Sequence, residues 1–74
     1  METFVDVYVN ANGDKASVIF KKINELGLKY HIGEHDFIYD WGHIASISDE
    51  LKLADKIQSK LIGTGAVLKF TTNR

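Results

Sequence analysis

The chain has 74 residues and a formal net charge of −1, from nine Lys and Arg against ten Asp and Glu. Its length allows one domain, and a nearly neutral chain without a basic stripe has little of the counterion-release driving force that nucleic-acid binding uses. It has no cysteine, which excludes disulfides and thiolate metal sites. Neither a run of about 20 apolar residues nor a signal-peptide pattern is present, so we expect a cytoplasmic protein with no membrane and no direct nucleic-acid partner.

A strand and a helix are expected at the start of the chain. Residues Thr3–Asn10 predict a strand, with its valines on one face and Phe4, Asp6 and Tyr8 on the other. A turn-rich loop follows, and Asp14 is the expected N-cap. The helix is predicted over Lys15–Leu26 because apolar residues recur at i, i+3, i+4 and i+7, and Gly27 is expected to end it.

Two further strands are expected in the middle of the chain. Leu28–Ile32 alternates and predicts a strand with Ile32 on its apolar face. Phe37–Ile44 is a second apolar run, in which Ile44 lies on the face opposite to three aromatic residues. These aromatic residues are Phe37, Tyr39 and Trp41.

A second helix and a last strand complete the pattern. Ser46 or Ser48 is the expected N-cap of the helix, and a Gly-Thr-Gly segment at 63–65 ends it. The last strand is predicted over Val67–Thr71. The expected apolar stripe of the helix consists of Leu51, Ala54, Ile57 and Leu61.

The order strand, helix, strand, strand, helix, strand is typical of the ferredoxin-like βαββαβ fold. We therefore expect one α+β domain over residues 1–74, with a four-stranded antiparallel sheet and both helices on one face. The other face also carries large apolar residues, such as Phe4 and Tyr8 opposite the valines. Because a monomer rarely exposes such a surface, we predict that a second copy covers it, sheet to sheet, in a homodimer or higher homo-oligomer.

The segment Gly33-Glu34-His35-Asp36 concentrates polar chemistry between two apolar runs. Glycine lets the backbone approach a ligand closely, and a carboxylate can pair with an ammonium group. The same residues also suit a tight turn in which Asp36 stabilises the backbone. Both interpretations of Asp36 stay open from the sequence.

From Phe4 to Thr71 the chain resembles the effector-binding domain of the Lrp/AsnC family of feast/famine regulators in the order and spacing of its motifs. The motifs are an apolar first strand, a Gly before the first helix, Gly-x-x-Asp before an apolar strand, an acidic helix start and a final strand. They correspond to Phe4–Val9, Gly13, Gly33–Asp36, Asp49-Glu50-Leu51, Gly65-Ala66-Val67 and Lys69-Phe70-Thr71.

This resemblance implies a non-enzymatic module without a cofactor that binds an amino-acid effector between neighbouring dimers. The implied ligand-binding residues are Gly33, Glu34, His35, Asp36, Lys69 and Thr71. Lys69 stands where the family usually has a threonine, which alters or removes effector binding. The family's helix-turn-helix domain is not found in the chain, so we expect a stand-alone form that contributes to transcriptional or metabolic regulation through a partner, such as a full-length relative.

Three other interpretations follow from the residues. One is a small enzyme of the dimeric α+β barrel kind, although no nucleophile–base signature is present. Another is a structural or interaction domain without a ligand. The third is a metal site at the histidines; a hairpin turning at Glu34–His35 would set His31 opposite Ile38, far from His43, so we expect none.

Overall fold

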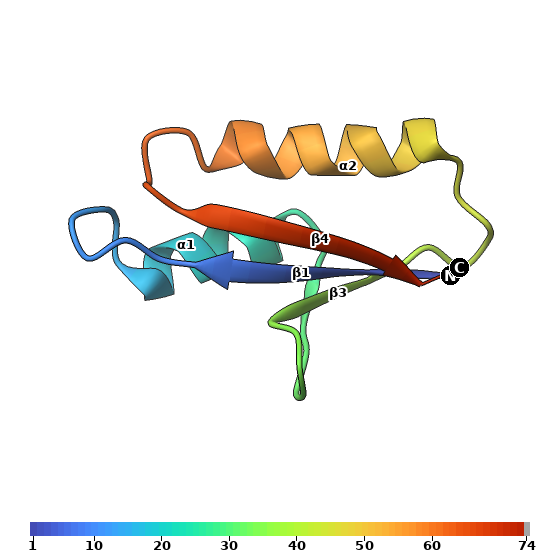
Figure 1. Cartoon of the computed structure of the whole chain (residues 1–74), viewed down its shortest axis with the longest axis horizontal. Coiled ribbons are helices and arrows are strands. Elements are labelled where there is room, and N and C mark those ends of the chain that lie inside the picture. Colours follow the sequence, from blue (N-terminus) through green and yellow to red (C-terminus); the bar gives the residue numbers. More distant parts are fainter. Residues whose placement is uncertain (74) are drawn as a thin grey trace.

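The computed structural model describes residues 1–73 and shows one four-stranded sheet with two helices (Figure 1). The strand order is β2-β3-β1-β4 and every neighbouring pair is antiparallel. This α+β arrangement has the element order and strand order of the ferredoxin-like fold, as predicted. The elements are β1 (Glu2–Tyr8), α1 (Ala16–Glu25), β2 (Lys29–Tyr30), β3 (Phe37–Asp40), α2 (Ile47–Lys60) and β4 (Val67–Asn73).

The core lies between the helices and one face of the sheet. Phe37 of β3 is fully buried, and its ring packs on Phe20 of α1 with 5.1 Å between centroids. Each apolar side chain that is fully buried in this way contributes about 1.5–3 kcal/mol to folding. The core cluster consists of Val5, Ile19, Ile23, Leu28, Phe37, Leu53, Ile57 and Leu61.

Helix α1 begins differently from the prediction. Its N-cap is Lys15, with no side-chain capping bond, so the expectation that Asp14 caps the helix is wrong. The loop between β1 and α1 is instead fixed to the α2–β4 connection, because the Asp14 N–H donates to the Thr64 carbonyl at 3.0 Å. The Asp14 carboxylate lies 3.9 Å from the Lys22 ammonium. At the other end, Gly27 follows the helix with φ of +98°, as a helix-ending glycine does.

Helix α2 begins at Ser46, one of the two predicted caps, and buries Ile57 and Leu61 as predicted, but not Leu51. The Ser46 hydroxyl accepts the Asp49 N–H and the Asp49 carboxylate accepts the Ser46 N–H, both at 3.1 Å, which is a capping box. Leu51 is 59% exposed, so its predicted place in the core is wrong, and Leu53 is buried instead. Leu53 and Ile57 are four residues apart and share a face, whereas Leu51 lies about 200° around the helix from Leu53.

Strands β1, β2 and β4 begin or end at other residues than predicted. β1 ends at Tyr8, and Val9 is exposed beyond it. β4 continues past Thr71 to Asn73 because β1 pairs with it along its whole length. β2 is only two residues long and Ile32 is fully exposed, since the chain leaves the sheet after Tyr30.

β3 stops at Asp40, where the sequence predicted a strand to Ile44. The Asp40 carboxylate accepts the Gly42 N–H at 3.0 Å, and Gly42 has φ of +71°, so the chain turns there. Ile44 therefore lies outside the sheet and is 87% exposed. The three aromatic residues of this run share one face, as predicted, and that face packs against the core.

Candidate ligand-binding site

The strand register brings the two parts of the predicted site to one face of the sheet. Val5 is buried under the helices, so its neighbours along β1 point to the opposite face. β1 pairs with β4 so that Asp6 stands opposite Lys69, and Phe4 opposite Thr71. We call the helix-free face of these two strands the open face. It is formed by Phe4, Asp6, Tyr8, Val67, Lys69 and Thr71.

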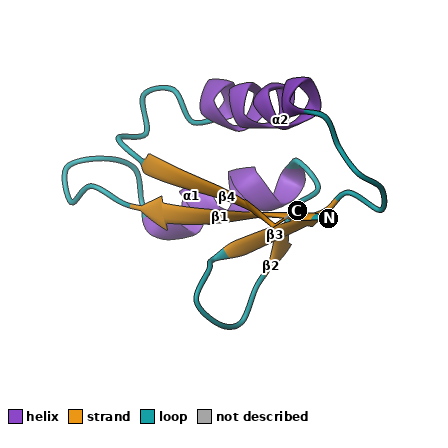
Figure 2. Cartoon of the chain, turned by 45° about the vertical axis from the view of Figure 1, so that its right-hand side comes forward, coloured by secondary structure: helices purple, strands orange, loops and turns teal. Residues whose placement is uncertain are grey.

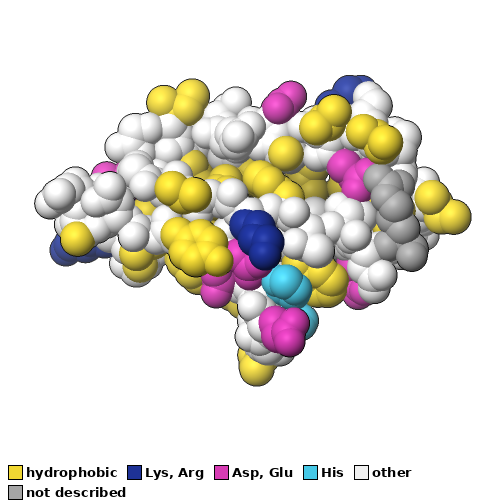
Figure 3. Space-filling model, in the orientation of Figure 1, with side chains coloured by type: hydrophobic (Ala, Val, Ile, Leu, Met, Phe, Trp, Pro, Cys, Tyr) yellow, Lys and Arg dark blue, Asp and Glu magenta, His cyan; other side chains and the backbone are white. Residues whose placement is uncertain are grey.

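Side chains of opposite charge gather in the middle of the open face, beside a histidine and apolar side chains (Figure 3). Lys69 is exposed, and its ammonium has no carboxylate within ion-pair distance among residues 1–73. Asp6 lies beside it in register and is half-buried. A positive and a negative group are therefore presented side by side on adjacent strands.

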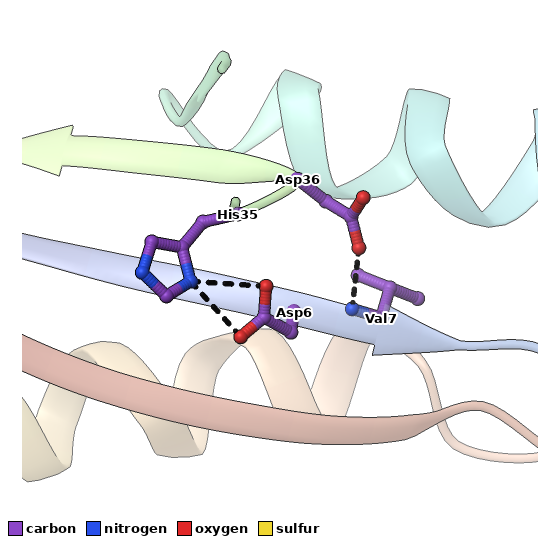
Figure 4. A network of polar contacts seen from close by, with 4 residues as sticks. All are labelled: Asp6, Val7, His35 and Asp36. Atoms are coloured by element: carbon purple, nitrogen blue, oxygen red, sulfur yellow. Dashed lines mark hydrogen bonds and ion pairs between the residues drawn. The ribbon is translucent and has the colours of Figure 1, made fainter. Parts of the chain in front are cut away.

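The connection between β2 and β3 projects from the sheet on the side away from α2 (Figure 2). Two contacts with β1 hold it (Figure 4). His35 Nδ1 lies 3.0 Å and 3.1 Å from the two Asp6 carboxylate oxygens, and Asp36 Oδ2 accepts the Val7 N–H at 2.8 Å. The first contact is an ion pair while His35 is protonated. The second contact, from Asp36 to Val7, adds one side-chain hydrogen bond between β1 and the start of β3 beyond the Val5–Phe37 pair.

Both histidines of this connection reach the Phe4 ring. The His35 ring stacks on Phe4 with 4.6 Å between centroids, and His31 meets it edge-on at 5.4 Å. The His31 N–H donates to the Asp36 carbonyl at 2.9 Å, so His31 lies opposite Asp36 and the predicted pairing with Ile38 is wrong. The register of β2 and β3 is therefore shifted by two residues from the expected one, and the contacts of His31 and His35 with Phe4 place the loop over part of the open face.

His43 lies apart from these two histidines, with its ring 6.3 Å from that of Trp41. Within the described residues 1–73, no three His, Asp or Glu side chains form a group that could hold a metal ion. The buried Nδ1 of His31 has no hydrogen-bond partner in the same range.

The predicted site residues have different positions and partners. Gly33 has φ of +144°, a conformation that favours glycine, and makes the turn possible. Glu34 is exposed, and its carboxylate has no partner within the part of the chain that the structure describes. One oxygen of Asp36 accepts the Val7 N–H, so this carboxylate joins the connection to β1, and no bond of it to the turn's own backbone is found within residues 1–73. Thr71 is exposed on the open face, two residues from Lys69.

Sequence reasoning did not predict that the loop at residues 33–36 contacts Asp6 and Phe4. Their alternation with the valines placed them on the face away from the helices. Their contact with the loop depends on how β1 and β3 pair, which is a contact between segments about 29 residues apart. A long-range register of this kind has no local sequence signal.

Comparisons with known proteins add no relative. No protein-family model, curated protein or solved structure matches this chain. The resemblance to the Lrp/AsnC effector domain therefore stays a prediction from motif order. Among residues 1–73, no helix is long and apolar enough to cross a membrane.

Proposed function

We propose that this chain is a non-enzymatic, oligomeric amino-acid-binding module whose ligand binds on the open face beside residues 33–36. The observation that carries the proposal is the strand register that sets Lys69 opposite Asp6 on the open face, where the connection that holds the exposed Glu34 contacts β1. An amino acid carries one carboxylate and one ammonium group on the same carbon. Lys69 suits the carboxylate, and Glu34 or Asp6 suits the ammonium.

Oligomerisation is part of the proposal because the open face is apolar at one end. Tyr8 and Val67 stand opposite each other in register and are 59% and 63% exposed. A second copy packed on this end would bury both side chains and enclose the neighbouring polar groups. The charged groups of a ligand enclosed in this way interact more strongly with the charged side chains of the protein than they would in open solvent. The resemblance to the Lrp/AsnC family supports the same assembly and a regulatory role through a full-length partner.

A thermal-shift screen over the proteinogenic amino acids, on a sample of measured oligomeric mass, tests the proposal. A ligand at ten times its Kd adds RT ln 11, about 1.4 kcal/mol, which raises the Tm of a domain this small by about 6–11 °C. Lys69→Gln should raise the Kd about tenfold by removing a charge-assisted contact. Lys21→Gln, at an exposed position of α1, is the matched control and should leave the Kd unchanged.

The proposal fails if no amino acid shifts the Tm at about 10 mM in an oligomeric sample, a concentration that reveals even millimolar affinities. It also fails if Lys69→Gln and Lys21→Gln bind equally well. A purely structural or interaction domain would give either result.

A further inference from the structure

A hollow of about 380 Å³ lies on the other side of the sheet, between the end of β3 and the first three turns of α2. Ligand pockets in proteins have volumes of roughly 300–1,000 Å³. The hollow therefore has room for a small molecule with one ring. Its lining consists of Tyr39, Trp41, Asp49, Lys52, Leu53 and Lys56.

The floor of the hollow is aromatic and held in place. The Tyr39 and Trp41 rings meet edge to face, with 4.8 Å between centroids and 72° between planes. The indole N–H of Trp41 donates to the Thr3 hydroxyl at 2.8 Å, and that hydroxyl is 3.0 Å from the Thr72 hydroxyl. Because Thr3 is buried, its bond fixes the orientation of the indole. With its polar atom engaged in the protein, the indole offers an apolar surface to the hollow.

The rim of the hollow carries a net positive charge. Lys52 and Lys56 are one helical turn apart and exposed, and neither ammonium has a carboxylate within ion-pair distance in residues 1–73. Asp49 is the one acidic group of the lining, and its carboxylate is engaged with the backbone N–H of Ser46. Hydrogen bonds from the Ser46 backbone and side chain lower the pKa of Asp49, so it stays ionised and offsets one of the two lysines.

We propose that this hollow binds a small aromatic monocarboxylate, with its ring on Tyr39 and Trp41 and its carboxylate at Lys52 and Lys56. An aromatic ring packs favourably edge to face or offset against these two rings. One carboxylate matches the single net positive charge of the lining. An amino group next to the carboxylate is disfavoured, because it would stand beside the two ammonium groups.

This site is separate from the one on the open face. The two lie on opposite faces of the sheet, share no residue, and select for different charges. Either site can therefore be present without the other.

Trp41 is the only tryptophan of the chain, so its fluorescence reports on the hollow directly. We expect 3-phenylpropionate to change this fluorescence saturably, with a Kd of about 1 mM for an open site that binds a ligand of this size. The amine 3-phenylpropylamine, which keeps the ring and reverses the charge, should give at most a tenth of that affinity. Propionate, which lacks the ring, should give no saturable change.

The double variant Lys52→Gln/Lys56→Gln should raise the Kd for 3-phenylpropionate about tenfold, because it removes the charge-assisted contacts. Both positions are exposed, so the variant should keep its fold, which circular dichroism checks. Lys60 lies on the same helix outside the lining, so Lys60→Gln is the matched control. Its Kd for 3-phenylpropionate should stay within about twofold of that of the unaltered chain.

Three results would overturn the proposal. They are the absence of a saturable change up to about 20 mM acid, an equal response to acid and amine, and an unchanged Kd in the double lysine variant. A hollow that a second copy of the chain covers would give the first of these results.

Discussion

Replacement of Asp36 by alanine should destabilise the fold more than replacement of the exposed Glu34 by alanine. The Asp36 carboxylate accepts the Val7 N–H at 2.8 Å, and Val7 lies two residues beyond Val5, the last β1 residue paired with β3. The same residue closes the loop through its carbonyl, which accepts the His31 N–H. Alanine keeps the carbonyl bond and removes only the carboxylate bond. The substitution therefore isolates one interaction.

The expected loss follows from the kind of bond and its burial. Hydrogen bonds to charged groups contribute about 1.5–3 kcal/mol to stability, and this one is only partly buried. We therefore expect a loss near the lower end, about 1.5–2 kcal/mol. With an m-value of about 1 kcal/mol/M for a chain this small, the urea midpoint should fall by about 1.5–2 M.

Urea unfolding followed by circular dichroism measures this loss at equal protein concentration, because stability of an oligomer depends on concentration. Asp36→Asn keeps an acceptor oxygen and should recover part of the stability. Glu34→Ala is the control, since Glu34 is exposed, and its midpoint should stay within about 0.5 M of the unaltered chain. Equal midpoints for Asp36→Ala and Glu34→Ala would refute the structural role assigned to Asp36.

Three further predictions concern the helix ends and the loops. Ser46→Ala should cost about 1 kcal/mol in urea unfolding by removing the N-cap of α2, whereas Ser48→Ala, inside the helix, should cost less; equal losses would contradict the capping box. Hydrogen bonds from Ser46 hold the pKa of Asp49 below its ordinary value of 3.8. The stability that the ionised Asp49 adds to the fold is therefore present above the pKa of Asp49 in the unfolded chain, and it is lost as the pH falls through the pKa of Asp49 in the folded chain. Asp49→Asn should therefore be less stable than the unaltered chain at pH 7, and the difference should shrink below about pH 4; a constant difference would count against this cause. Gly13→Ala places a methyl group against the Thr64 carbonyl oxygen, and should lower the stability by about 1–3 kcal/mol; a stability equal to that of the unaltered chain would show that the two loops are not in contact.

The order of the elements could be predicted from the sequence because the signals are local. The apolar period of α1 identified Ile19 and Ile23, the glycine after it marked its end, and the serines at 46 and 48 bounded the start of α2 to within two residues. These patterns depend on residues within one or two helical turns. Propensity and capping chemistry act over the same range.

One residue of the buried stripe of α2 was predicted wrongly, while Ile57 and Leu61 are buried as predicted. Leu51 and Leu53 are both apolar, and the choice between them depends on the angle at which the helix meets the sheet. That angle is set by tertiary packing. The structure buries Leu53 and exposes Leu51.

The candidate site was predicted in its parts and not in its assembly. The loop residues 33–36 were predicted from their polar chemistry and the β4 residues Lys69 and Thr71 from a resemblance, while their relation to each other runs through Asp6 and Phe4 of β1. Two strand registers place these groups together, Asp6 opposite Lys69 and Val5 opposite Phe37. A slip of one residue in either register would reverse the faces, so the site depends on long-range pairing that a single sequence does not specify.

The most direct test of amino-acid binding on the open face is the amide NMR spectrum of the chain with a mixture of the proteinogenic amino acids. The proposal predicts chemical-shift changes in residues 33–36 and at Asp6, Lys69 and Thr71, with little change in α1. Changes confined to the helices, or an unchanged spectrum at about 10 mM of each amino acid, would contradict it.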